Sequence, residues 1–192
     1  MKMDSWDEIY RKVPLDEIAW HSEKPPRPLV DAVRELKGGK ALDLCCGAGT
    51  NSIFLAKKGF DVTGIDISPA AIGIAKRRAG DEGVKVDFLV GNVLEFRPDR
   101  VFDFVFDRGC FHHMSREKRP QFASNLAAML AKGGRFQLMA FSARNRFEKS
   151  LTKDEIRGVF SPYFEVGEIG EELHTEPGGS KVYLYAALMA RR

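Results

Sequence analysis

A short apolar run that passes through two glycines into a helix start is the feature that most constrains this chain. Residues 42–52 read LDLCCGAGTNS, so Gly47 and Gly49 separate the apolar run from Thr50. Glycine lets the backbone approach a ligand closely because it has no Cβ, and a helix N-terminus offers unpaired N–H groups. A buried strand, a glycine loop and a helix in this order favour a ligand site at the end of a parallel strand.

Apolar runs that end at Gly, Asp or Asn recur along the rest of the chain. Seven strands are expected, at residues 41–46, 61–66, 86–92, 102–107, 134–141, 163–170 and 181–189. The first five lack polar alternation, which is typical of strands buried on both faces of a parallel sheet. Helical patterns lie between most of them. We therefore expect an α/β fold with a doubly wound, Rossmann-like, mostly parallel seven-stranded sheet, helices on both faces and an antiparallel last strand.

Length, charge and cysteine usage narrow the class of protein. The length of 192 residues favours a single domain over residues 1–192. The net charge of +3 predicts neither a nucleic-acid nor a membrane partner. No apolar run approaches the roughly 20 residues of a membrane span, and the first residues do not resemble a signal peptide. Three cysteines, two of them adjacent, favour a reducing compartment, so we expect a cytoplasmic protein.

The N-terminal residues 1–26 differ from the Rossmann-like core expected at 27–192. Apolar side chains recur there at helical spacing, which predicts a short amphipathic helix that ends before Pro14. This segment either packs on the sheet edge or forms a lid over the strand ends, where it would exclude water from a ligand. The helical positions are Trp6, Ile9, Tyr10 and Val13, and a lid would also carry Trp20 and His21.

Two acids accompany the glycine loop. Asp43 precedes Gly47 by four residues, where a carboxylate would repel a pyrophosphate but would suit a ligand with an ammonium group. Asp66 ends the second expected strand, at the place from which a carboxylate accepts hydrogen bonds from ribose hydroxyls. Ser52 stands where a dinucleotide-binding loop would carry its third glycine. An adenosine with a cationic, zwitterionic amino-acid tail fits both acids.

Five motifs in order give the chain a family resemblance. They are LDLCCGAG at 42–49, VTGIDIS at 62–68, VGNV at 90–93, FDFVFD at 102–107 and LAKGGR at 130–135. With these motifs the chain resembles the class I S-adenosyl-L-methionine-dependent methyltransferases over roughly residues 27–190. Residues 49–62 and the WDEIY of residues 6–10 are similar in particular to the small tellurite- and thiopurine-resistance branch. The resemblance implies S-adenosyl-L-methionine as methyl donor and S-adenosyl-L-homocysteine as product.

The resemblance also implies which residues bind this cofactor. Asp43 and the loop with Gly47 and Gly49 would hold the methionine part, and Asp66 would hold the ribose. Ile67 would flank the adenine. For Asp43 and Asp66 the alternative is that the carboxylate only caps a helix or a turn.

Further cofactor contacts are implied at the ends of the third and fourth strands. Asn92 and Val93 would meet the edge of the adenine, and an amide oxygen can accept a hydrogen bond there as a carboxylate would. Asp107 and Arg108 would lie between the cofactor and the methyl acceptor. Asp107 could instead cap the turn that follows it.

The acceptor side is expected immediately after the fourth strand. His112 and His113 are adjacent, so both cannot face one ligand in an extended segment, and we expect no metal site. One of them is a candidate general base, the alternative being a neutral histidine that shapes the pocket. Cys110 fits a small buried residue better than a nucleophile. The basic loop at 144–149 is either solvated or attracts an anionic acceptor, and the loop at 171–180 could border the same opening.

The expected function is methyl transfer to a small-molecule acceptor. Such a transfer depends mainly on alignment and the exclusion of water, so a general base is optional and the acceptor decides whether one is needed. A thiol or other soft nucleophile is the first expectation, from the family resemblance. O- or N-methylation of a small metabolite, a non-catalytic binding protein and a nucleotide-dependent oxidoreductase are the alternatives.

Overall fold

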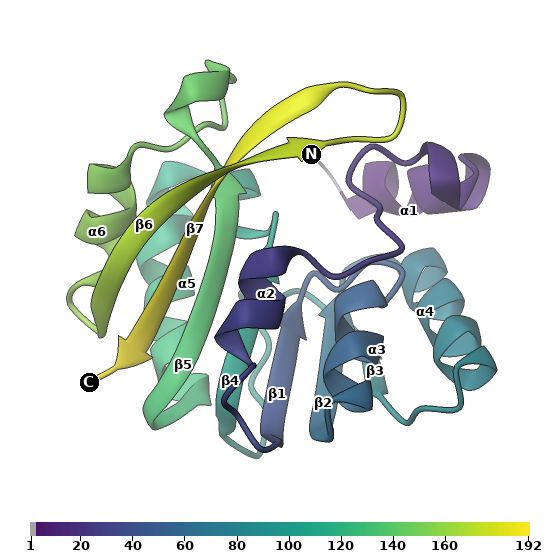
Figure 1. The fold of residues 1–192 in the computed structure, drawn as a ribbon, viewed down its shortest axis with the longest axis horizontal. Helices are drawn as coiled ribbons and strands as arrows, with labels where there is room; N and C mark the ends of the chain where they lie inside the picture. Colours follow the sequence, from purple (N-terminus) through teal and green to yellow (C-terminus); the bar gives the residue numbers. More distant parts are fainter. Residues whose placement is uncertain (1–2) are drawn as a thin grey trace.

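A seven-stranded sheet forms the centre of the computed structural model, which describes residues 3–192 (Figure 1). The strand order is β3-β2-β1-β4-β5-β7-β6. Neighbours among β1 to β5 are parallel, whereas β7 is antiparallel to both β5 and β6. The predicted fold class and antiparallel last strand are therefore confirmed. The strands are β1 Gly39–Leu44, β2 Phe60–Asp66, β3 Asp87–Val90, β4 Phe102–Arg108, β5 Leu130–Phe141, β6 Phe164–Thr175 and β7 Lys181–Arg191.

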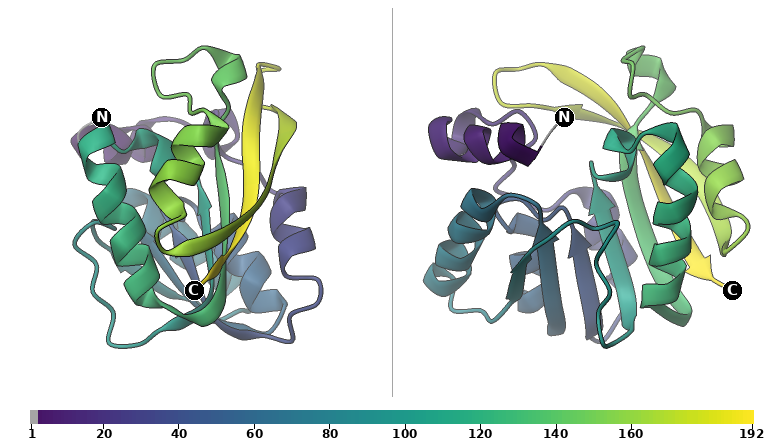
Figure 2. Two further views of the ribbon diagram at one scale, coloured as in Figure 1. Left: turned by 90° about the vertical axis from the view of Figure 1, so that its left-hand side faces the viewer. Right: turned by 180° about the vertical axis from the view of Figure 1, so that it is seen from behind.

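Helices cover both faces of the sheet. Helices α2 and α3 lie on one face and α5 on the other, as the front and rear views show (Figures 1 and 2). Two helices begin with side-chain caps: the Ser68 hydroxyl accepts a hydrogen bond from the Ala71 N–H at 3.1 Å, and Thr152 and Glu155 form a capping box. The helices are α1 Met3–Lys12, α2 Arg27–Ala32, α3 Thr50–Lys57, α4 Pro69–Asp81, α5 Arg119–Met129 and α6 Lys153–Phe160.

The core explains the unbroken apolar runs of the sequence. Alternate side chains of β4 enter different clusters: Val105 packs with residues of α5 and α6, and Phe104 and Phe106 pack with α2. All three are fully buried. A central strand with a helix layer on each face has no solvent side, so its sequence cannot alternate.

Strand β5 is longer than predicted. β5 begins at Leu130, four residues before the expected start, because Leu130 pairs with Phe102 across an irregularity in the register. Gly133 adopts a φ of +73° in this irregular stretch. A pattern of alternating or continuous apolar residues cannot reveal such a bulge, because the extra residues are left unpaired.

The fold brings the site to the carboxyl ends of the strands. From β1 the chain continues to β2 on one side and β4 lies on the other, so the order of connections changes between β1 and β4. Ligands of open α/β sheets bind at such a point. The predicted N-terminal helix is present as α1, and it lies above these strand ends near α4 (Figures 1 and 2). In the described chain, no helix is both long and apolar enough to cross a membrane.

Candidate functional site

The loop after β1 is shaped by residues in the left-handed region of backbone space. Cys45, Gly47 and Gly49 have φ of 51°, 54° and 81°. A Cβ on Gly47 would stand 2.5 Å from the Tyr10 hydroxyl, and one on Gly49 would stand 2.9 Å from the Ala75 methyl group. Both positions therefore require glycine for space as well as for conformation.

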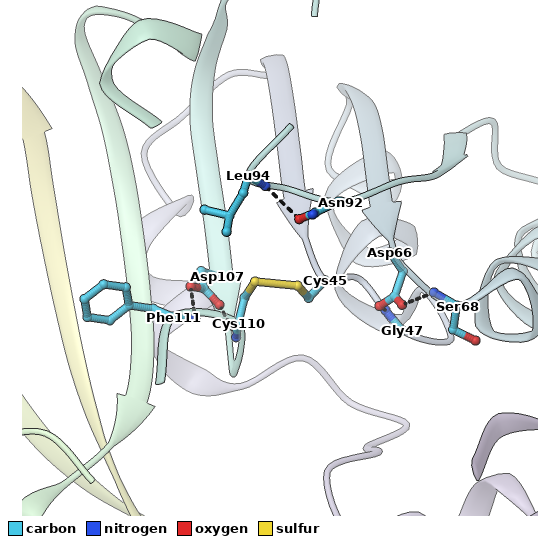
Figure 3. Close-up of a disulfide and its surroundings, with 9 residues drawn as sticks. All are labelled: Cys45, Gly47, Asp66, Ser68, Asn92, Leu94, Asp107, Cys110 and Phe111. Atoms are coloured by element: carbon cyan, nitrogen blue, oxygen red, sulfur yellow. Dashed lines mark hydrogen bonds between the residues drawn. A yellow bond between two sulfur atoms is a disulfide. The ribbon is translucent and has the colours of Figure 1, made fainter. Parts of the chain in front are cut away.

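Asp66 joins this loop to the start of α4 (Figure 3). One carboxylate oxygen accepts a hydrogen bond from the Gly47 N–H at 2.9 Å, and the other accepts from the Ser68 N–H at 2.9 Å. The side chain is almost buried, and this burial raises the pKa of Asp66. Asp66 thus lies beside the glycine loop, as the sequence predicted, and fixes its position.

Asp43 lies beneath the glycine loop, at the buried end of β1. Its residue pairs with β2 on one side and β4 on the other, and its side chain is 1% exposed. The Ser52 hydroxyl donates to its carboxylate at 2.6 Å. Burial raises the pKa of Asp43 to about 7, to which the charge of Asp66 contributes. In this position Asp43 anchors the first turn of α3.

The residues predicted to surround an adenine are brought beside Asp66. The Gly91 N–H donates to the Asp66 carbonyl at 2.9 Å, which places Asn92 close to Ile67. The Asn92 side-chain oxygen accepts from the Leu94 N–H at 3.0 Å, so this amide caps the turn after β3 (Figure 3). Val93 is buried in the core cluster, whereas Ile67 is half-buried.

Asp107 caps the turn that follows β4. Its two carboxylate oxygens accept hydrogen bonds from the Cys110 N–H at 2.7 Å and the Phe111 N–H at 2.9 Å (Figure 3). The side chain is fully buried, and burial raises the pKa of Asp107 to about 7. The capping role that the sequence left open for Asp107 is the one its hydrogen bonds serve.

A disulfide between Cys45 and Cys110 connects the glycine loop to the turn after β4 (Figure 3). The two Cα atoms are 5.7 Å apart and the residues are 65 positions apart in the chain. Cys46 is buried and unpaired. Counting cysteines did not predict this pair, because the signal is the adjacency of two strand ends, which exists only in the folded sheet.

His112 is buried and held in one tautomer. Its ring stacks on Phe141 with the centroids 3.9 Å apart, and its Nδ1 accepts from the Phe141 N–H at 3.1 Å. Burial, with help from the charges of His113 and Lys149, lowers the pKa of His112. The ring is therefore neutral with its proton on Nε2, and it can donate but not accept at that atom.

His113 is in a similar state, with a different hydrogen-bond partner. Its Nδ1 lies 2.9 Å from the Lys149 ammonium, which can only donate. Burial first, then the charge of Lys149, lowers the pKa of His113 to about 4. The ring also meets the edge of Trp6 from α1, with the centroids 4.9 Å apart. Lys149 belongs to the basic loop that the sequence singled out, but its histidine partner could not be predicted.

The N-terminal segment bridges these two parts of the site. Trp20 Nε1 donates to the Tyr10 hydroxyl at 2.9 Å, and Trp20 meets the edge of Trp6 with centroids 5.0 Å apart. The Asp7 carboxylate accepts from the Ser68 hydroxyl and the Ala70 N–H, each at 2.8 Å. The aromatic residues thus extend from the Gly47 loop to His113, and Asp7 fixes α1 on the start of α4.

A further pair lies at the end of β4. Arg108 Nη2 donates to His174 Nε2 at 2.7 Å, and His174 belongs to the β6–β7 hairpin. Burial lowers the pKa of Arg108, and burial with the Arg108 charge lowers the pKa of His174. Across residues 3–192, no group of three or more His, Cys, Asp or Glu side chains is arranged to hold a metal ion.

Comparisons with known proteins agree with one another on the class. Residues 41–134 match a family model described as a methyltransferase domain. A Mycobacteroides abscessus protein, 2-heptyl-1-hydroxyquinolin-4(1H)-one methyltransferase, is 26% identical over 179 residues, which are 86% of this chain and 78% of that protein. The probable S-adenosyl-L-methionine-dependent methyltransferase TehB of Haemophilus influenzae is 24% identical over 174 residues. That alignment covers 85% of this chain but only 61% of TehB.

Solved structures share the fold. A protein whose structure accompanies the conversion of a disulfide bond into a thioacetal group during echinomycin biosynthesis superposes with a TM-score of 0.88 at 23% identity. The superposition covers 98% of this chain and 91% of that one. The crystal structure of H. influenzae TehB gives a TM-score of 0.75 at 21% identity, over 97% of this chain and 66% of that one.

Proposed function

We propose that the chain is a class I S-adenosyl-L-methionine-dependent methyltransferase and that it methylates a small molecule, first among the candidates a thiol or other soft nucleophile. The support is the state of the two histidines beside the expected acceptor, both neutral with Nδ1 already accepting a hydrogen bond. The Nε2 atom of each ring therefore carries the proton, and neither histidine can act as a base. An acceptor that reacts as an anion or as a neutral amine needs none.

The residues after β1 and β2 fit the cofactor. Gly47 and Gly49 carry no Cβ in this loop, and α3 begins directly behind it. Asp66 and Asn92 lie on neighbouring turns, where a carboxylate and an amide could receive ribose hydroxyls and an adenine edge. We therefore assign binding to Gly47, Gly49, Asp66, Ile67, Asn92 and Val93, with Asp43 and Asp107 acting by holding the loops from beneath.

When bound, S-adenosyl-L-methionine supplies an electrophilic methyl group on a sulfonium. The chain's own part is to align the acceptor and to exclude water. Within residues 1–26, the part that the structure describes serves this as a lid over the core at 27–192: Tyr10 stands over the Gly47 loop and Trp6 over His113. The Nε2 protons of His112 and His113 can only donate, so they orient an acceptor and do not deprotonate it.

The test is formation of S-adenosyl-L-homocysteine by the full chain with aryl thiols, phenols and amines as acceptors. Thiols are expected to react fastest. With a series of thiols of different acidity, the pH dependence of kcat/KM should follow the pKa of each thiol, because the nucleophile is the thiolate. A pH dependence fixed at one value for every thiol would mean that the chain supplies a base. Turnover with phenols or amines but not with thiols would show that the acceptor is an oxygen or nitrogen nucleophile instead of a thiol.

The histidine roles have their own readout. His113→Ala should raise KM for the acceptor and leave the affinity for S-adenosyl-L-homocysteine, measured by calorimetry, within about two-fold. Phe147→Ala, at an exposed position of the neighbouring loop, is the matched control. A general base would instead show itself as a large fall in kcat with KM unchanged.

A further inference from the structure

We propose that Arg108, held in place by His174, binds an anionic group of the methyl acceptor, so that the acceptor class is a small molecule with a carboxylate or comparable anion. This inference rests on the proposed function, because it assigns specificity within the same site. Arg108 follows Asp107 directly at the carboxyl end of β4. The glycine loop lies at the same end of the neighbouring strand β1.

The surroundings of Arg108 are unusual for a half-buried cation. A desolvated guanidinium is normally paired with a carboxylate. No ion pair among residues 5–192 includes Arg108, whose hydrogen-bond partner is instead the imidazole of His174. The charge of Glu176 raises the pKa of Arg108, but Glu176 forms no ion pair with it. The charge of Arg108 is therefore still available to a ligand.

The hydrogen bond to His174 leaves most of the guanidinium free. Guanidinium carries five N–H donors in a planar fork that matches a carboxylate with two parallel hydrogen bonds. One of these donors is used by His174 Nε2, which must be unprotonated to accept it. The imidazole thus holds the side chain in one orientation without neutralising it.

The position of His174 places this cation on the side of the cofactor loop where the acceptor is expected. The β6–β7 hairpin arches over the strand ends toward α1 (Figure 1). Its residue Glu171 accepts hydrogen bonds from Ser142 and Arg144 of the loop after β5, so the hairpin is tied to the segment that also carries Lys149. Arg108 lies between the cofactor loop and this hairpin, where the acceptor must approach.

The alternative is that Arg108 only tethers the hairpin. The two roles differ in charge selectivity. If Arg108 were only a tether, Arg108→Gln would weaken the binding of every acceptor-site ligand alike. His174→Ala would then have the same effect. An anion-binding residue would discriminate between a carboxylate and its neutral amide, and His174→Ala would keep that discrimination because the guanidinium is still present.

The experiment is calorimetry of the full chain saturated with S-adenosyl-L-homocysteine, titrated with benzoate and with benzamide as matched probes. Wild type should bind benzoate roughly ten-fold more tightly than benzamide. Arg108→Gln should remove this preference. His174→Ala and Arg146→Gln, the latter an exposed arginine of the loop after β5, should retain it.

Three results would overturn an inference, and they are distinguishable. Equal binding of benzoate and benzamide to wild type, or a preference that survives in Arg108→Gln, would exclude the anion site. Absence of S-adenosyl-L-homocysteine binding in wild type would instead exclude the proposed function. If Arg108→Gln fails to bind S-adenosyl-L-homocysteine, Arg108→Lys replaces it, and a benzoate preference reduced at least about three-fold is then expected because the fork is lost.

Discussion

The cofactor side and the acceptor side of this site are built in different ways. On the cofactor side, the backbone N–H groups of Gly47 and Ser68 donate to Asp66, a residue that ends a neighbouring strand. On the acceptor side, single side chains from distant segments meet, such as His113 with Lys149 and Arg108 with His174. Backbone hydrogen bonds fix the shape of a loop, which then suits one kind of ligand. Side-chain pairs, in contrast, can be substituted without altering the fold. The cofactor side is therefore suited to be constant and the acceptor side to set specificity.

The disulfide joins the two sides, so breaking it gives the largest expected effect. Reduction of Cys45–Cys110 should lower the free energy of unfolding by about 2–4 kcal/mol, because the closed loop of 65 residues gains freedom in the unfolded chain. Denaturant titration with and without reductant measures this. A Cys45→Ser/Cys110→Ser double variant is the control and should not respond to reductant. Three reactive thiols in the unfolded, untreated protein would contradict the disulfide.

A side chain placed on the glycine loop should break the cofactor side alone. Gly47→Ala is expected to weaken binding of S-adenosyl-L-homocysteine about 100-fold, because the new Cβ would stand 2.5 Å from the Tyr10 hydroxyl. Gly59→Ala is the matched control: Gly59 also has a positive φ, of 86°, but a Cβ there would meet nothing within 4 Å. Calorimetry on both variants separates the clash from the conformational cost. Equal losses would place the effect in the backbone alone.

The buried acids beneath the two loops give a pH dependence of stability. Folding raises the pKa of Asp43 and of Asp107 to about 7, so the folded chain binds protons that the unfolded chain has lost. Their stabilising contribution is complete below about pH 4 and is lost as the pH rises through 7. The free energy of unfolding should fall by about 2–3 kcal/mol for each acid between pH 5 and 8, and so by about 5 kcal/mol for the two together.

Asp43→Asn should reduce this pH dependence, and Asp61→Asn at the exposed start of β2 should not. Denaturant unfolding at several pH values measures both variants against wild type. A wild-type stability that rises over the same range would show that neither acid binds a proton in the folded chain.

The smallest effect is expected where one acceptor-side pair is altered. Lys149→Met should raise the pKa of His113 from about 4 without restoring its ordinary value, because burial is the larger cause of the depression and is unchanged. An NMR titration of the imidazole measures this shift. Lys57→Met, at the end of α3, should leave the pKa unchanged. Unaltered affinity for S-adenosyl-L-homocysteine in Lys149→Met would sharpen the contrast between the two sides.

The sequence by itself determined the fold class and the order of the strands along the chain. Buried strands without alternation and the glycine turn at 47–49 are local patterns, and each was confirmed. Asp66 could be placed beside Gly47 because the carboxyl ends of adjacent parallel strands lie at the same edge of the sheet. The resemblance to S-adenosyl-L-methionine-dependent methyltransferases followed from motifs in order, which also belong to the sequence.

Only the tertiary structure decided the depth and the partners of the site residues. Asp43 lies beneath the loop because β1 is paired on both sides, which no single segment reveals. The disulfide and the protonation states of the histidines depend on contacts between residues that are 29 to 65 positions apart. Hydrogen bonding and burial set a side chain's charge, and both are properties of neighbours in space. The sequence could therefore predict where chemistry occurs, whereas the folded chain decides which groups carry a proton there.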